Sequence, residues 1–143
     1  MFNGMTNIIE RDLSNLDISK VINMESMFFG YLNLKKINFG NINTSSVTNM
    51  NQLFYACVNL KSVNLSNIVT SSLTSTGEMF KECQSLTSLD LTNIDLSKVE
   101  NMNNMFCNCI NMMKVDFSKF DASKVQYMNG MFFHCGKLRY PIC

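Results

Sequence analysis

The stretch LTSLDLTNIDLSKVENMNNMFCNCINM, residues 86–112, contains one full cycle of a pattern that runs through the chain. Its Met-Phe pair returns every 26 residues without insertion or deletion. A fixed period in this range is typical of a solenoid, in which each repeat stacks on the previous one. The period therefore predicts the fold class, and it favours binding over catalysis. The pairs are Met1-Phe2, Met27-Phe28, Leu53-Phe54, Met79-Phe80, Met105-Phe106 and Met131-Phe132.

Two periodicities alternate within residues 86–112. Leu86, Leu89 and Leu91 give the pattern L-x-x-L-x-L, which predicts a short strand. After a polar turn, apolar residues follow at steps of three, three, one and three, which predicts one face of a helix. We expect Ser97 to cap that helix, because its hydroxyl can accept from an amide of the first turn. The predicted helix face contains Val99, Met102, Met105, Phe106 and Cys109.

The resulting prediction is a single α/β solenoid domain over residues 1–143, with about five and a half strand-turn-helix coils and a parallel strand ladder on its inner face. Strands in a ladder lie roughly 4.8 Å apart, whereas packed helices lie roughly 8–10 Å apart. We therefore expect the stack to bend, with the strands inside. We also expect the repeated phenylalanine rings, from Phe28 to Phe132, to line up in one interior file.

Composition excludes several classes of function. Twelve basic and eleven acidic residues give a net charge of +1, without the basic stripe of a nucleic-acid binder. No apolar run approaches the roughly 20 residues of a membrane span. No phosphate loop or nucleotide fingerprint is present, and the one histidine, His134, has no evident orienting partner. We predict a protein that is not an enzyme, with no catalytic residue and no cofactor.

The cysteines share columns of the repeat. Cys57, Cys83, Cys109 and Cys135 occupy one slot at the edge of the predicted core, which favours a role as small buried apolar residues. Cys107 and His134 could approach this column across two coils, and such ligands can hold zinc. Because no C-x-x-C pair is present, we predict no metal site.

The repeat, with its combination LDLSN…D-x-S-x-V…M-x-x-MF-x-x-C, resembles the 26-residue BspA-like repeat of bacterial surface proteins and mycoplasma-type lipoproteins, and it does so over essentially the whole chain. The resemblance implies a leucine-rich-repeat solenoid and a surface or secreted protein that acts in adhesion by binding host or partner proteins. It implies no shared catalytic site. It also implies structural turn asparagines at Asn15, Asn41, Asn67 and Asn93, with Lys119 departing from the pattern.

Two settings stay open. No signal peptide is present, and the chain starts in mid-repeat. If it is a fragment of a larger protein, we expect it at the cell surface or secreted. If it is complete, we expect a cytoplasmic inhibitor or adaptor, encoded by a phage or mobile element, that blocks a host or defence protein.

Two candidate protein-binding surfaces follow from the columns. On the inner face, side chains between the strand leucines either form a solvated face or bind a partner; on the helix flank, aromatic side chains either pack locally or form an exposed interface. Arg11 begins to turn the N-terminal end polar, and Pro141 stops the ladder at the other end. If the N-terminal side nevertheless has no cap, we expect a homodimer through that uncapped end. The inner-face candidates are Lys35, Lys36, Asn38, Lys61, Asn64, Asp90, Lys114, Asp116, Arg139 and Tyr140, and the flank candidates are Phe29, Tyr55 and Phe133.

Overall fold

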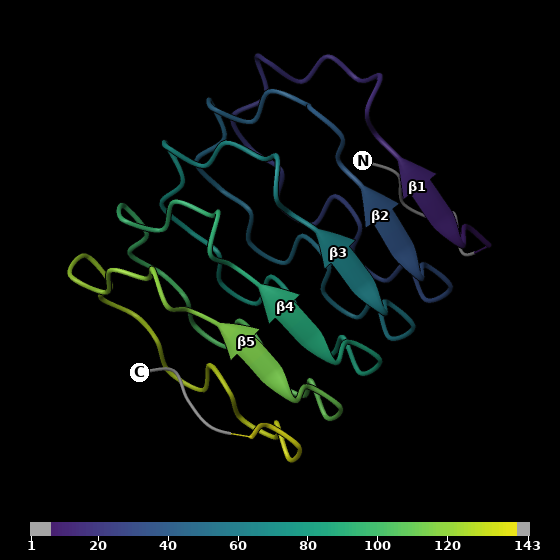
Figure 1. Ribbon diagram of the computed structural model, residues 1–143, viewed down its shortest axis with the longest axis vertical. Coiled ribbons are helices and arrows are strands. Elements are labelled where there is room, and N and C mark those ends of the chain that lie inside the picture. Colours follow the sequence, from purple (N-terminus) through teal and green to yellow (C-terminus); the bar gives the residue numbers. More distant parts are fainter. Residues whose placement is uncertain (1–6, 140–143) are drawn as a thin grey trace.

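The computed structural model describes residues 7–139 and forms a stack of coils that each contribute one strand of three residues. Figure 1 shows the strands side by side, with the chain advancing along the stack from β1 to β5. We call this the strand side. The strands are β1 (Glu10–Asp12), β2 (Lys36–Asn38), β3 (Ser62–Asn64), β4 (Ser88–Asp90) and β5 (Lys114–Asp116).

The strands pair in parallel, and every paired residue lies 26 positions from its partner, as in Arg11 with Ile37 and Leu89 with Val115. The middle residue of each strand faces the core, and its two neighbours face outward. The ladder is interrupted once: β1, β2 and β3 form one sheet, and β4 and β5 form another. The parallel repeat solenoid predicted from the period is confirmed, apart from this break.

The predicted helices are wrong: within residues 7–139 the structure contains no helix. Their place is taken by a second backbone ladder, the turn ladder, on the opposite side of each coil. At each junction four amides donate to the next coil over N···O distances of 2.7–3.0 Å, as Phe54 donates to the carbonyl of Met79. Bonds of this length require closely spaced coils, and packed helices would hold the coils roughly 8–10 Å apart. The ladder contains residues 23–30, 49–56, 75–82, 101–108 and 127–134.

Overlapping tight turns build this turn side. In each of four successive coils, three amides donate to the carbonyl three residues earlier, at positions spaced by two residues. Positive φ recurs at fixed columns, for example Gln52 at 55° and Ala56 at 57°. A positive φ at the third residue of a turn is the geometry that glycine or asparagine usually adopts. The apolar residues at steps of three therefore belong to consecutive turns and not to one face of a helix.

Because both sides of the coil are backbone ladders, the predicted mismatch in spacing, and the bend derived from it, have no basis here. The predicted helix cap is also wrong. Ser97 instead lies in an Asx turn, in which its amide and hydroxyl both donate to Oδ1 of Asp95, at 3.0 and 2.6 Å. The turn asparagines Asn15, Asn41, Asn67 and Asn93 are exposed and make no such bond within the described residues.

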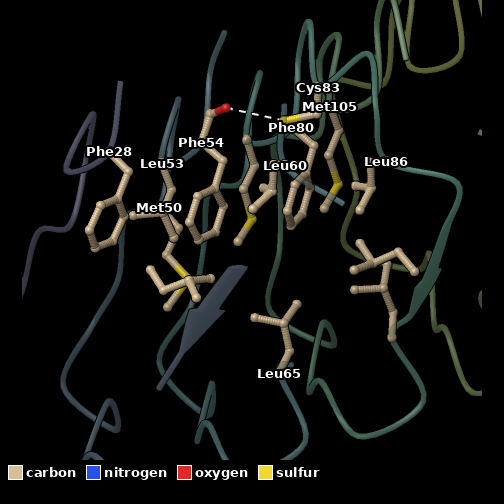
Figure 2. Packing of buried hydrophobic residues seen from close by; sticks show 14 of the residues in the cluster. Phe28, Met50, Leu53, Phe54, Leu60, Leu65, Phe80, Cys83, Leu86 and Met105 are labelled. Atoms are coloured by element: carbon tan, nitrogen blue, oxygen red, sulfur yellow. Dashed lines mark hydrogen bonds between the residues drawn. The ribbon is translucent and has the colours of Figure 1, made fainter. Parts of the chain in front are cut away.

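The core runs through the centre of the stack as one continuous cluster. The predicted file of phenylalanine rings is confirmed. Consecutive rings from Phe28 to Phe132 stack nearly parallel, with centroids 5.4–5.6 Å apart. Figure 2 shows Phe28, Phe54 and Phe80 in this file. The spacing of the rings matches the close spacing of the turn ladder.

Candidate protein-binding surfaces

The strand side presents the predicted inner-face residues to solvent. Lys35, Lys36, Lys61, Lys114 and Arg139 are exposed, and Asp116 is half-buried. Tyr140 lies outside the described residues. Along β1, β2 and β3 lies an open hollow of about 580 Å³ with a mixed polar and apolar lining. The candidates therefore share one face, as predicted.

Several of these side chains have structural partners. Asn38, Asn64, Asp90 and Asp116 each accept, through Oδ1, a hydrogen bond from the amide two residues later, at 2.9–3.0 Å. These bonds hold the turn after each strand and lower the pKa of the Asp90 and Asp116 carboxyls. Lys36 and Lys114 lie within ion-pair distance of Glu10 and Asp116. Local partners thus occupy part of the predicted surface.

The flank candidates lie on the turn side, and two of the three, Phe29 and Phe133, are exposed. Phe29 and Tyr55 stack face to face with centroids 4.8 Å apart and an interplanar angle of 3°. Phe29 is nevertheless 43% exposed and Phe133 58% exposed. Leu32 and Ile110, from the column three residues later, are also exposed. We call Phe29, Leu32, Tyr55, Val58, Ile110 and Phe133 the aromatic flank.

A charged coil divides the aromatic flank into two patches. Lys81 takes the aromatic slot there, with Nζ 5.2 Å from the centre of the Tyr55 ring and 3.6 Å from Oε2 of Glu78. The Tyr55 hydroxyl donates to Oε1 of Glu82 at 3.3 Å. Burial, and then the charge of Glu82, raise the pKa of Tyr55. Cys107 fills the next slot and is buried.

The other cysteine column forms a row of thiol hydrogen bonds that the sequence did not reveal. The Sγ atoms of Cys57, Cys83, Cys109 and Cys135 donate, over 3.0–3.2 Å, to the carbonyl of the phenylalanine in the preceding coil. Figure 2 shows the bond from Cys83 to Phe54. Burial raises the pKa of the Cys57 thiol to about 12. The thiols of Cys57, Cys83 and Cys109 act as buried donors, and a protonated thiol is a poor nucleophile and metal ligand.

Neither a metal site nor a membrane-spanning helix is found within residues 7–139. No group of three or more His, Cys, Asp or Glu side chains in this part of the chain is placed to hold a metal ion. His134 Nδ1 lies 3.0 Å from Oδ1 of Asn108, and its ring stacks on Phe133. None of the described residues forms a helix that could cross a membrane.

Two further hollows were not anticipated. Phe117, Phe120, Met128, Met131 and Phe132 are among the residues that line an apolar hollow of about 680 Å³ at the last described coil. A second hollow, of about 400 Å³, lies beside the strand side. One sequence signal could have located it: the column that holds Asn7, Asn33, Asn59 and Asn111 has serine at position 85 and lysine at position 137.

The parallel strands and the strict period define a repeat solenoid. The chain matches the family described as "Mycoplasma protein of unknown function, DUF285" over residues 1–111 and 77–143, and it belongs to that family. It is also similar to the crystal structure of a T. pallidum leucine-rich-repeat protein. That likeness has 20% identity and a TM-score of 0.40, and it covers 92% of this chain and 78% of the other. No curated protein matches the chain.

Proposed function

We propose that this protein is a protein-interaction module and that the aromatic flank is its main contact surface. The observation that carries the proposal is the exposure of ordered aromatic rings, since Phe29 is held in a stack with Tyr55 and yet is 43% exposed. Aromatic side chains that are already fixed lose little conformational entropy on binding and make frequent hot spots. Exposed apolar patches of this kind are typical of interfaces.

We propose a binding role rather than an enzymatic one. In support, burial raises the pKa of the Cys57, Cys83 and Cys109 thiols, so that each remains a protonated donor at neutral pH. The carboxyls of Asp90 and Asp116 are held in turns. Side chains bound in this way are not arranged as a nucleophile and its base.

For the setting, we propose a surface protein of the BspA-like type that contacts host or neighbouring cells, as the sequence resemblance suggests. The alternative, an intracellular inhibitor, would use the same flank. Self-association through the apolar hollow at the last described coil is a third proposal. That hollow would accept another coil of the same kind, because its lining includes Phe132, the last ring of the phenylalanine file.

The test replaces the exposed aromatics by lysine, which the same column already accommodates at Lys81. A partner identified by crosslinking and mass spectrometry is purified, and its Kd is measured against each variant. We expect Phe29→Lys and Phe133→Lys each to weaken binding by at least about tenfold, because a hot-spot residue contributes 2 kcal/mol or more. Urea unfolding should show little loss of stability.

The matched control is Ile22→Lys, which adds the same charge at a side chain that is 61% exposed and lies outside the flank. It should bind like the parent protein. Sedimentation of the same samples separates partner capture from self-association. Unchanged Kd values for both flank variants would contradict the proposal.

A further inference from the structure

Among the described residues, one hollow is lined by two lysines, by hydroxyl and amide side chains and by Met113, with no acid in its lining. It lies at the edge of the strand side, where the chain enters the strands, and has a volume of about 400 Å³. We call it the lysine hollow. It is lined by Lys61, Ser85, Thr87, Asn111, Met113 and Lys137.

The hollow coincides with a change in the asparagine column. The Asn59 and Asn111 side-chain amides donate to the carbonyls of Leu32 and Gln84 in the preceding coil, at 2.7 and 2.8 Å. Ser85 is too short to make this bond. Its backbone amide donates to the carbonyl of Val58 instead, at 3.1 Å. The shorter side chain leaves open the space that asparagine would take.

The same place is the break in the strand ladder. The amides of Lys61, Met113 and Arg139 each donate to the carbonyl 26 residues earlier, at 2.8–3.1 Å. The corresponding amide of Thr87 has no hydrogen-bond acceptor among residues 7–139. Thr87 therefore brings both an unused backbone donor and a hydroxyl to the lining of the hollow. Thr87 is exposed, so this amide is open to solvent and to a ligand in the hollow.

The charges around the hollow have one sign. Lys137 Nζ donates to Oδ1 of Asn111 at 2.6 Å, which holds one ammonium group at the rim. Within the described residues, the ion pairs involve Lys36, Lys81 and Lys114, and neither Lys61 nor Lys137 takes part in one. Positive charge without a local counterion attracts an anionic group.

We infer that the lysine hollow binds the carboxylates of an acidic segment on the protein partner. The inference rests on the proposed function and gives the partner a second contact, polar and acidic, beside its apolar one. Lys61 and Lys137 supply charge, and the Ser85 and Thr87 hydroxyls and the Thr87 amide supply donors. Lys61 and Lys137 belong to coils three steps apart in the 26-residue period, at roughly 4.8 Å per step, so a short run of acidic residues can reach both and a single small anion cannot.

The test uses a hexaglutamate peptide and ¹⁵N-labelled protein. We expect saturable amide shifts centred on residues 61, 85–88, 111–114 and 137. The Lys61→Glu, Lys137→Glu double variant should weaken peptide binding by about tenfold or more, since charge pairs at a partly exposed site add to one another. The control, Lys20→Glu with Lys119→Glu, makes the same change in net charge at exposed positions outside the hollow and should bind as before.

A second variant separates a shaped site from general electrostatics. Ser85→Asn restores the residue of the neighbouring coils, keeps the charge, and should fill the hollow by bonding across the coils as Asn59 does. We expect it to weaken hexaglutamate binding severalfold. If Ser85→Asn binds the peptide like the parent protein, or if the control double variant loses binding equally, the inference is overturned.

Two further measurements distinguish an acidic segment from a small anion, and the lysine hollow from the aromatic flank. Inorganic phosphate at matched ionic strength should produce weak shifts at most, and saturation by phosphate at equal affinity would overturn the assignment to an acidic segment in favour of a small anion. Phe29→Lys should still bind hexaglutamate. Failure of the aromatic flank as an interface would thus be distinguishable from failure of the lysine hollow.

Discussion

The two sides of each coil are joined to the neighbouring coils by different hydrogen-bonded ladders. On the strand side, three-residue strands pair in parallel, and their ladder is interrupted between β3 and β4. On the turn side, bridges continue without a gap from Asn23 through Asn49, Ser75 and Asn101 to Tyr127. The turn side also holds the ring file and the thiol bonds. The comparison indicates that the turn side maintains the stack, which leaves the strand side free to vary.

This division matches the placement of the candidate sites. The lysine hollow lies where the strand ladder is broken, so a local change there leaves the continuous ladder opposite intact. The aromatic flank lies on the turn side, where stacking fixes the exposed rings. One side thus offers variable polar contacts and the other offers rigid apolar contacts.

The largest expected effect compares two buried phenylalanines. Phe80, on the turn side, stacks on rings at 5.4 and 5.6 Å, whereas Phe39, which follows β2, makes an edge contact with Phe54 at 6.2 Å. We expect Phe80→Ala to lower the free energy of unfolding by about 3–5 kcal/mol. Phe39→Ala should cost about 1 kcal/mol less, because aromatic stacking adds to the cost of the cavity.

Urea unfolding at neutral pH measures both values. If Phe80→Ala does not fold, the pair Phe80→Leu and Phe39→Leu should show the same order with smaller losses. Equal losses, or a greater loss at Phe39, would contradict the idea that the turn side carries more of the stability.

The period and the ring file could be predicted from the sequence, because identical residues 26 positions apart must stack if the coils do. The turn ladder could not. Steps of three suit overlapping turns as well as a helix, and Gln52, Glu78 and Glu82 have positive φ although their residue types favour helices. The residues there whose types indicated left-handed backbone were Gly30, Gly130, Asn104 and Asn108. The predicted file of stacked rings offered one clue, since rings in contact cannot span the roughly 8–10 Å between packed helices.

The candidate surfaces were predictable in part for a similar reason. Which side chains share a column follows from the period, so the exposure of Phe29, Phe133 and Lys61 could be anticipated. The period does not reveal which backbone hydrogen bonds are missing. The break at Thr87 lies beside Ser85, whose amide bonds to Val58, and such a local change of hydrogen bonding is a property of packing rather than of the period.

A second prediction concerns the thiols of the turn side. Burial raises the pKa of Cys57 from 9.0 to about 12 and also raises the pKa of Cys83 and Cys109. An unfolded thiol loses its proton near pH 9, and the folded one keeps it. The stabilisation is therefore fully present below pH 9 and is lost as the pH rises toward 12. Between pH 8 and 10 we expect a loss of about 1 kcal/mol for each buried thiol.

Denaturant titrations in the presence of a reducing agent measure this loss. Cys83→Ala should show a smaller change between the two pH values than the parent protein, because one thiol fewer must ionise on unfolding. A free energy of unfolding that is equal at pH 8 and pH 10 would mean that the thiols are accessible to water in the folded state.

The smallest expected effect tests the left-handed backbone of the turn ladder with the two alanines of the chain, Ala56 and Ala122. Ala56 has a φ of 57° and shares its column with Gly30, whereas Ala122 lies outside the turn ladder and is not among the residues with positive φ. An L-residue in the left-handed region costs about 1–2 kcal/mol, and glycine avoids this cost but loses about 0.5–1 kcal/mol of backbone entropy. Ala56→Gly should therefore raise the free energy of unfolding by about 0.5 kcal/mol, and Ala122→Gly should lower it by a similar amount. Opposite signs in paired urea titrations would locate the strain in the turn ladder. A loss of stability in both variants would mean that Ala56 is relaxed there and that the turns are held by side-chain packing alone.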